Sequence, residues 1–350
     1  MNDSHTKPTG VILVGARLPA ISGSGLILRE IERSLESDSE VDLSIVDLSF
    51  IRRRGLVGAC RYLSRLARTL RFGFGAKVMI LFTIGSGLPA TLLPFKVIAF
   101  LTRTPLVVRC TGGTAHAHGG ALRQRIVRAL LGTVPLYVVE TELLRDDAHQ
   151  HGLSQCQALP NGRNLSNAVV AAHDPEGRWI MVSRLLPTKG VVEAVEAFRR
   201  MPELSLDLVG PFENGLEWED LDATENVRWR GSLDPEDIPE FLSQYDGFVF
   251  PSYYPTEGHA GVLIEAMAAG LPVVTTRFRS LPEVIDDSCG ILVPPRDVDA
   301  IVDAVRRIES DQDYRERLVA GSLSRARLFD WSTLSRRFNE LVLGLGRGRS

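Results

Sequence analysis

Two glutamates eight residues apart are the first candidates for chemistry, because each has an unusual setting. Glu265 is the only polar residue between Val262 and Ala269, and a helix that is apolar on all sides is expected to be buried. A lone buried carboxylate is costly unless it is hydrogen-bonded, so Glu265 requires a polyhydroxylated or cationic partner. Glu257 precedes this helix in a loop of small residues, where backbone N–H groups can approach a phosphate closely. We expect this loop to line the ligand site with Gly258, His259, Ala260 and Gly261.

Two cations follow a strand that the apolar run Trp179–Ser183 predicts. Arg184 comes directly after it, and Lys189 follows five residues later, before a helix that begins near Val191. Side chains just past a parallel strand lie at the carboxyl edge of the sheet, where ligands bind in open α/β folds. The natural partner of two such cations is a diphosphate, and the alternative is a pair of surface cations near a helix start.

The segment Pro251–Thr276, PSYYPTEGHAGVLIEAMAAGLPVVTT, resembles the donor-site signature of the family-four (group 1) retaining glycosyltransferases of GT-B fold, which use nucleotide-sugar donors. The resemblance implies that Glu257 lies beside the donor sugar and that Glu265 accepts hydrogen bonds from the ribose hydroxyls. It also implies that Arg184 and Lys189 hold the donor diphosphate and neutralise the leaving group. His259, Ala260 and Gly261 depart from the Phe-Gly-Leu of many members, which leaves the donor sugar open.

Two further loops carry candidate residues in the first half of the chain. Gly23, Ser24 and Gly25 lie between the first strand and a helix predicted from about Leu26 to Leu35, and small residues there let backbone approach a phosphate. This loop is either a phosphate-facing loop, as the resemblance implies, or a plain turn. The loop after Arg109 contains His116 and His118. Either histidine lies near the donor sugar, as in related enzymes, or both are simple loop residues.

Short apolar runs alternate with helical patterns throughout, which predicts α/β architecture with parallel sheets. The predicted strands of the first half are Val11–Val14, Val41–Asp47, Val78–Phe82, Leu106–Arg109 and Leu136–Glu140. Those of the second half are Trp179–Ser183, Leu206–Val209, Val227–Trp229, Gly247–Phe250, Val273–Thr275 and Gly290–Val293. Each half has enough strands for one nucleotide-binding fold, and the polar stretch 170–177 between them is typical of a linker.

The resemblance implies a GT-B fold, with two Rossmann-like domains that face a central cleft. We expect an acceptor-binding domain at 1–170 and a nucleotide-sugar-binding domain at 177–330, with a C-terminal helix at about 331–345 that crosses back to the first domain. The turn Leu159–Gly162 resembles the family turn that ends the first domain.

Composition is that of a globular protein of 350 residues, 44% hydrophobic and 24% charged. Four scattered cysteines without a C-x-x-C pair indicate reduced core thiols in a cytoplasmic protein, with neither a zinc site nor a disulfide framework. The polar start lacks the length of a signal-peptide core, and glycines and prolines interrupt the apolar stretch 78–101, so neither export nor a membrane span is expected.

Charge is divided unevenly along the chain. Residues 1–165 carry 20 Lys and Arg against 12 Asp and Glu, whereas residues 166–350 carry 20 against 31. Segment 52–77 holds eight basic residues and no acidic one, interleaved with leucines. It is either a segment that rests on anionic lipid headgroups or a solvated helix face over a core. A peripheral position on the inner face of the membrane follows from the first interpretation, and no nucleic-acid partner is expected.

The resemblance implies transfer of a sugar, with retention and without a metal or cofactor, from a UDP- or GDP-linked donor to an acceptor hydroxyl. The expected acceptor is a glycan or lipid-linked glycan in bacterial surface polysaccharide or glycolipid synthesis. Two alternatives stay open. One is a sugar-nucleotide epimerase or phosphorylase-like transferase on the same fold, and the other is an inactive carbohydrate-binding or scaffold protein.

Overall fold

A computed structural model describes residues 8–17, 23–49, 56–84, 88–113, 120–171 and 174–347. The chain forms two compact units, one of residues 1–161 with 332–350 and the other of residues 162–331. The division falls at Asn161, before the linker expected at 170–177. The reason is that residues just after it bond within the second unit, since Arg163 N donates to Phe329 O at 3.0 Å and Ala171 N donates to Ala269 O at 3.0 Å.

The first unit is built on a six-stranded parallel sheet in the order β2-β1-β3-β4-β5-β6. Its strands are β1 (Thr9–Gly15), β2 (Val41–Asp47), β3 (Val78–Ile84), β4 (Leu106–Thr111), β5 (Leu136–Val139) and β6 (Cys156–Ala158). The central strands β3 and β4 are buried almost throughout, which is why they read as continuous apolar runs rather than alternating ones. The edge strand β6 has only three residues and was not predicted.

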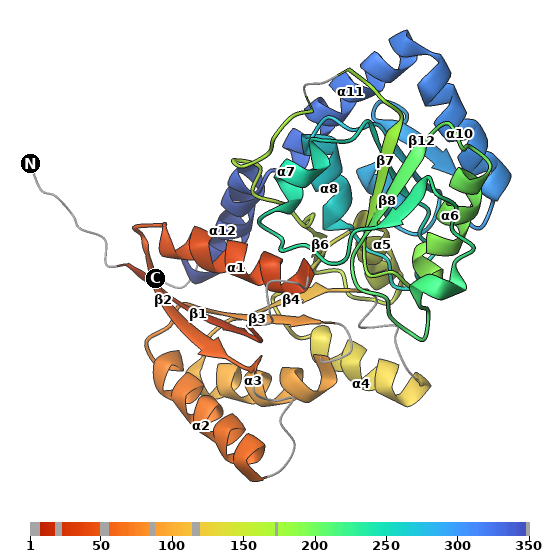
Figure 1. The fold of residues 1–350 in the computed structure, drawn as a ribbon. Coiled ribbons are helices and arrows are strands. Elements are labelled where there is room, and N and C mark those ends of the chain that lie inside the picture. The colour runs from red at the N-terminus through yellow and green to blue at the C-terminus, as the bar shows by residue number, and fades with distance from the viewer. Residues whose placement is uncertain are drawn as a thin grey trace, which may run out of the picture. The chain divides into compact units, whose positions relative to one another are not determined.

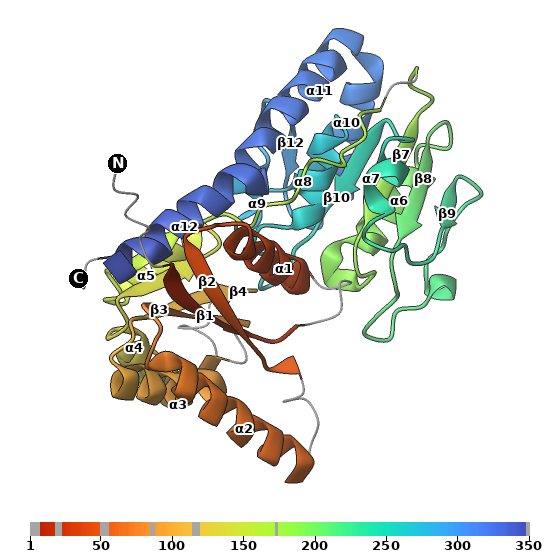
Figure 2. The ribbon, with the colours of Figure 1, turned by 90° about the vertical axis from the view of Figure 1, so that its left-hand side faces the viewer.

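Helices cover both faces of this sheet. On one face lie α2 (Leu56–Gly73), α3 (Leu88–Thr102) and α4 (Ala121–Leu131), and on the other lie α1 (Gly23–Glu36) and α12 (Trp331–Arg347), as Figures 1 and 2 show. The remaining helix is α5 (Glu142–Gln150). The last helix returns to the first unit, as predicted, and the side chain of Asn339 bonds to Ser34 and to Asp38, both at 3.4 Å.

The second unit repeats this plan with a parallel sheet in the order β12-β11-β10-β7-β8-β9. The strands are β7 (Arg178–Val182), β8 (Ser205–Val209), β9 (Val227–Trp229), β10 (Gly247–Phe250), β11 (Val273–Thr276) and β12 (Gly290–Val293). The helices are α6 (Val191–Arg199), α7 (Ile238–Leu242), α8 (Gly261–Ala268), α9 (Leu281–Val284), α10 (Val298–Ser310) and α11 (Gln312–Ala326). In this unit α6 packs with α10 and α8 packs with α11.

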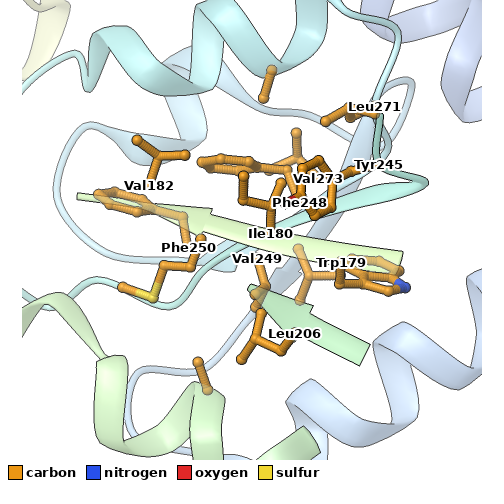
Figure 3. Close-up of a cluster of buried hydrophobic side chains, with 14 of the residues drawn as sticks. Trp179, Ile180, Val182, Leu206, Tyr245, Phe248, Val249, Phe250, Leu271 and Val273 are labelled. Carbon is orange, nitrogen blue, oxygen red and sulfur yellow. The ribbon is translucent and has the colours of Figure 1, made fainter. Parts of the chain in front are cut away.

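A close-packed apolar core fixes the neighbouring strands β7 and β10 (Figure 3). The ring of Trp179 is fully buried, and its Nε1 donates to Glu309 Oε1 at 2.8 Å. A Cβ on Gly247 would lie 2.7 Å from this ring, so only glycine lets β10 pass so close to it. Packing of this density holds the ends of the two strands in place.

Two expectations are corrected by the structure. Helix α1 begins at Gly23 and not at about Leu26, so Gly23, Ser24 and Gly25 form its first turn rather than a loop. Cys60 on α2 is exposed, whereas Cys110, Cys156 and Cys289 are buried free thiols as expected. In the part of the chain that the structure describes, no helix combines the length and apolar character needed to cross a bilayer.

Candidate active site

The carboxyl ends of the paired strands β7 and β10 bring the principal candidates together. Arg184 follows β7, and Lys189 ends the short 3-10 helix Pro187–Lys189. Gly190 then adopts a φ of 79°, and a Cβ there would lie 2.2 Å from Pro251 O. This close approach requires glycine, and it places the cation-bearing turn against the start of the Pro251–Thr276 segment.

Lys189 and Glu257 form a buried ion pair. The Lys189 Nζ donates to Glu257 Oε1 at 2.9 Å and to Oε2 at 2.7 Å, and the two side chains are 11% and 7% exposed. Ser252 Oγ also donates to Glu257 Oε2. Both charges are therefore satisfied by the chain itself, as burial of an ion pair requires.

The ring of Tyr254 contacts both Arg184 and Lys189, the two cations predicted to bind a diphosphate. Its ring centroid lies 4.9 Å from Lys189 Nζ and 5.7 Å from Arg184 Cζ. Arg184 also donates to Glu213 Oε2 at 3.0 Å. Partial burial works to lower the pKa of Arg184, but hydrogen bonding with Tyr254 and the charge of Glu213 outweigh it and raise that pKa overall. The arginine therefore presents a permanent charge beside a half-buried aromatic ring.

Glu265 has a cationic partner that the sequence reasoning missed. Arg163 Nε donates to Glu265 Oε1 at 2.6 Å, and Arg163 Nη1 donates to Gly162 O at 3.0 Å. A Cβ on Gly261 would lie 1.6 Å from Arg163 Nη2 and 2.0 Å from its Cζ. The guanidinium thus occupies the space that a side chain at the first residue of α8 would fill. The side chain of Arg163 can therefore adopt this position only because residue 261 is a glycine.

His259 is the least satisfied polar side chain at the entry to α8. The side chain is 3% exposed, and neither ring nitrogen has a hydrogen-bond partner among the described residues. Nε2 lies 3.5 Å from Glu283 Oε2, outside hydrogen-bond geometry, and the ring meets Phe329 edge-on with centroids 5.7 Å apart. Buried polar atoms are normally paired, so the unpaired ring nitrogens of His259 are an exception at this site.

The remaining residues of the loop complete the start of α8. Ala260 is the N-cap in an extended conformation without a side-chain cap, and Gly261 is the first helical residue. Gly258 lies between this loop end and Glu257, whose backbone N donates to Tyr254 O at 2.9 Å. An uncapped helix start leaves backbone N–H groups that suit an anion.

A cavity of about 400 Å³ lies at the same edge of the second sheet, beyond β8 and β9. The ring of Phe212 lies 6.5 Å from Trp218 and 5.1 Å from Trp229 between centroids. Glu213, which pairs with Arg184, directly follows the lining residue Phe212. It is lined by Pro211, Phe212, Glu217, Trp218, Glu219, Trp229 and Ser232.

Gly23, Ser24 and Gly25 lie at the carboxyl edge of the sheet of the first unit. Ser24 Oγ accepts a hydrogen bond from Thr111 Oγ1 at 3.2 Å, which ties the first turn of α1 to the end of β4. Gly23 and Gly25 flank it in the same turn. His116 and His118 lie outside the described residues, and their role stays a prediction.

A buried polar network holds Gly112, the residue that directly follows β4. Arg109 is fully buried and donates to Val139 O and to Asn161 Oδ1, both at 2.8 Å. Asn161 Nδ2 donates to Glu140, which also accepts from Gly112 N at 3.2 Å. Burial lowers the pKa of Arg109 to about 10, so the guanidinium stays charged at neutral pH. Among the described residues, no group of three His, Cys, Asp or Glu side chains could hold a metal ion.

Comparison with known proteins finds a family match for part of the second unit. Residues 166–323 match the model of the glycosyl transferases group 1. The O-antigen chain mannosyltransferase B of Escherichia coli is 30% identical over 166 residues, which cover 45% of this chain and 43% of that protein. The chain spans about half the length, or less, of the curated relatives that it matches.

Solved structures match over nearly the whole chain. Sucrose-phosphate synthase from Thermosynechococcus elongatus has a TM-score of 0.78 at 18% identity, covering 97% of this chain and 100% of that one. Anabaena HepE in complex with UDP and glucose has a TM-score of 0.74 at 17% identity, covering 95% and 99%. These identities establish the fold alone. The chain therefore has the GT-B fold of these proteins, and its residues 166–323 match the glycosyl transferases group 1.

Proposed function

We propose that the chain transfers a sugar, with retention, from a nucleotide diphospho-sugar to an acceptor hydroxyl. The observation that carries the proposal is the convergence of Arg184, Lys189 and Glu257 around Tyr254 at the carboxyl edge of one sheet. Two cations beside a carboxylate suit a donor with an anionic diphosphate and a sugar rich in hydroxyl groups. The family match and the UDP and glucose bound to the HepE neighbour support the same donor class.

In the proposed reaction the bond between the anomeric carbon and the diphosphate oxygen breaks while the acceptor oxygen bonds to the same face of that carbon. The acceptor proton passes to a donor phosphate oxygen, which leaves with the nucleoside diphosphate. Arg184 and Lys189 stabilise the negative charge that grows on the leaving group, and this contribution is largest in the transition state. Glu257 holds Lys189 in place and lies beside the donor sugar. These residues supply the charge stabilisation, so the reaction is expected to need no metal ion or cofactor.

The donor nucleoside is proposed to lie along the second unit. Glu265 would exchange Arg163 for the ribose hydroxyls, and the backbone of Gly258–Gly261 would meet the phosphates. The aromatic cavity beyond β8 and β9 would hold the base by stacking, a mode that accepts either uracil or guanine. A UDP- or GDP-linked sugar therefore fits this proposal.

The acceptor is proposed to be a glycan or lipid-linked glycan of bacterial surface polysaccharide or glycolipid synthesis, bound by the first unit at the cytoplasmic face of the membrane. The similarity to an O-antigen mannosyltransferase supports this class. The basic segment 52–77 supports a peripheral position, because surface cations near anionic lipids are each attracted by about 1 kcal/mol. In this proposal Gly23, Ser24 and Gly25 line the acceptor side of the site, with His116 and His118 nearby.

A thermal-shift panel of nucleotide sugars tests the proposal first, because a ligand that binds only the folded state raises its apparent stability. We expect one nucleotide sugar to raise the Tm, Arg184→Ala to abolish turnover with little effect on acceptor binding, and activity to survive excess EDTA. NMR of the product would show the anomeric configuration. Conversion of the donor without an acceptor would indicate an epimerase, and the absence of any binding would indicate a scaffold protein.

A further inference from the structure

An unbroken acid-free region covers one face of the first unit. Between Asp47 and Glu140 the sequence contains no aspartate or glutamate, but it contains fourteen lysines and arginines. This region includes all of α2, α3 and α4, which together cover one face of the sheet (Figures 1 and 2). Apart from the buried Arg109, these cations extend the electropositive surface beyond segment 52–77, and no carboxylate of these helices offsets it.

The same helices expose large apolar side chains. On α3, Leu88, Leu92 and Phe95 are buried against the sheet, whereas the outer side is also apolar. The spacing of its exposed residues, at i, i+4, i+7 and i+8, puts them on one stripe, and Phe100 is 82% exposed. The stripe consists of Leu93, Val97, Phe100 and Leu101, and further exposed apolar residues nearby are Leu63, Phe74, Leu122 and Ile126.

Cations flank this stripe. Arg61, Arg68 and Arg71 are exposed on α2, which packs against α3, and Arg125 is exposed on α4. Lys96 Nζ donates to Leu130 O at 2.6 Å and so joins α3 to α4. A surface that is both apolar and cationic matches the headgroup region of an anionic bilayer, where apolar side chains enter and cations meet phosphates.

We propose that α3 and α4 insert their exposed apolar side chains into the headgroup region of an anionic glycerophospholipid bilayer, and that the arginines of α2 and α4 bind its phosphates. This inference rests on the peripheral membrane position proposed above and extends it from electrostatic attraction to insertion. In this proposal the helices lie in the headgroup region, parallel to the membrane surface. Docking by this face would bring the first unit to acceptors that are anchored in lipid.

The exposed Cys60 on α2 provides a probe, because the other three cysteines are buried. The full chain, labelled there with an environment-sensitive fluorophore, is mixed with vesicles of phosphatidylcholine, with or without phosphatidylglycerol. We expect binding and a blue shift only with phosphatidylglycerol. Part of the binding should survive high salt, since salt screens the charges but not the insertion.

Matched variants separate the two contributions. Phe100→Ser with Leu101→Ser should lower vesicle binding at high salt by at least about tenfold, whereas Val192→Ser with Leu328→Ser, also exposed apolar residues, should leave it unchanged. Arg61→Glu, Arg68→Glu and Arg71→Glu should lower binding at low salt by at least about tenfold. The control set is Arg228→Glu, Arg306→Glu and Arg317→Glu, exposed in the second unit.

Several outcomes would overturn the inference. One is vesicle binding of the Phe100→Ser, Leu101→Ser variant at high salt that equals wild-type binding. Another is wild-type binding to neutral vesicles that equals its binding to anionic vesicles. The third is self-association through this face without vesicle binding. Because vesicle binding is measured without donor or acceptor, its failure is distinct from failure of the proposed transfer activity, and nucleotide-sugar binding by the same variants reports the latter separately.

Discussion

Glu257 holds Lys189 by both of its carboxylate oxygens, at 2.7 and 2.9 Å, across 68 residues of sequence. The two residues come from the loops that follow neighbouring strands, and Gly190 allows those loops to touch. The lysine is therefore positioned before any ligand arrives. Electrostatic groups held in place in this way need little reorganisation during a reaction.

Removal of either member of this pair should damage both stability and turnover. Lys189→Ala leaves the Glu257 carboxylate buried without its cation, which costs about 3–5 kcal/mol, and it removes charge stabilisation from the leaving group. Urea denaturation and steady-state kinetics measure the two effects. Lys189→Met with Glu257→Leu should regain much of the stability and none of the activity. Recovery of turnover by this double variant would exclude both residues from the chemistry.

Substitution in the Arg163–Glu265 pair should affect ligand binding, because binding of the donor is expected to break this pair. Glu265→Gln should weaken binding of the nucleoside diphosphate by about 1.5–3 kcal/mol, since it replaces a charge-assisted bond to the ribose. Isothermal titration calorimetry measures this loss. Asp286→Asn, which disrupts the separate pair with Arg325, is the matched control. Equal affinities for the wild type and the Glu265 variant would disprove the ribose contact.

Gly261 and Arg163 should be coupled in stability. Gly261→Ala places a methyl group where the guanidinium of Arg163 lies, so this single variant should lose stability and Arg163 should move. Overpacking of this kind typically costs about 1–3 kcal/mol. In the presence of Arg163→Ala the same change at Gly261 should cost less, which a double-mutant cycle would show. Additive effects would mean that the two residues do not share this space.

His259→Phe separates a ligand-binding role from a structural one. Because neither ring nitrogen has a hydrogen-bond partner among the described residues, an apolar ring of similar size should leave the Tm unchanged or raise it. If the donor supplies the missing partner, affinity for the nucleotide sugar should fall by about tenfold, while affinity for the nucleoside diphosphate alone changes less. A thermal shift with each ligand measures both. A lower Tm with unchanged affinities would make His259 a structural residue.

Thiol reactivity should be confined to one cysteine. Burial raises the pKa of the Cys110 and Cys156 thiols to about 12, so they remain protonated and unreactive at neutral pH. Cys289 is also buried, with its thiol pKa raised mainly by burial. A native chain should therefore react with one equivalent of a thiol reagent, and Cys60→Ser should react with none. Mass spectrometry of the modified peptides identifies the site.

The sequence predicted the strands well because parallel strands buried on both faces read as apolar runs, and Val78–Ile84 is such a run. It missed Cys156–Ala158, where alternating burial over three residues leaves too short a pattern. It singled out Lys189 and Glu257 separately, but their contact depends on which strands are neighbours. Arg163 was missed, although Glu265 required a polyhydroxylated or cationic partner, because the two residues lie 102 positions apart in the sequence.

The other residues missed at this site depend on tertiary contacts. Tyr254 stood in the segment that was singled out, but only the fold shows that its ring lies between two cations. Residues 162–170 were assigned to the first unit because a linker was expected at 170–177, although the turn Leu159–Gly162 resembles the one that ends the first domain. The bonds of Arg163 to Phe329 and of Ala171 to Ala269 could not be predicted from composition. In both cases the structure depends on contacts between residues that are far apart in the sequence, and a local sequence pattern does not reveal such contacts.

The return of α12 to the first unit has a consequence for synthesis on the ribosome. The first unit consists of two separate pieces of chain, whereas the second, Gly162–Trp331, is continuous. Buried side chains of α12, such as Phe338 and Val342, become available to the first unit only after the whole second unit has been synthesised. The continuous unit can therefore complete its fold first, although it is encoded later. Until then, the nascent first unit exposes apolar surface that a chaperone would need to cover.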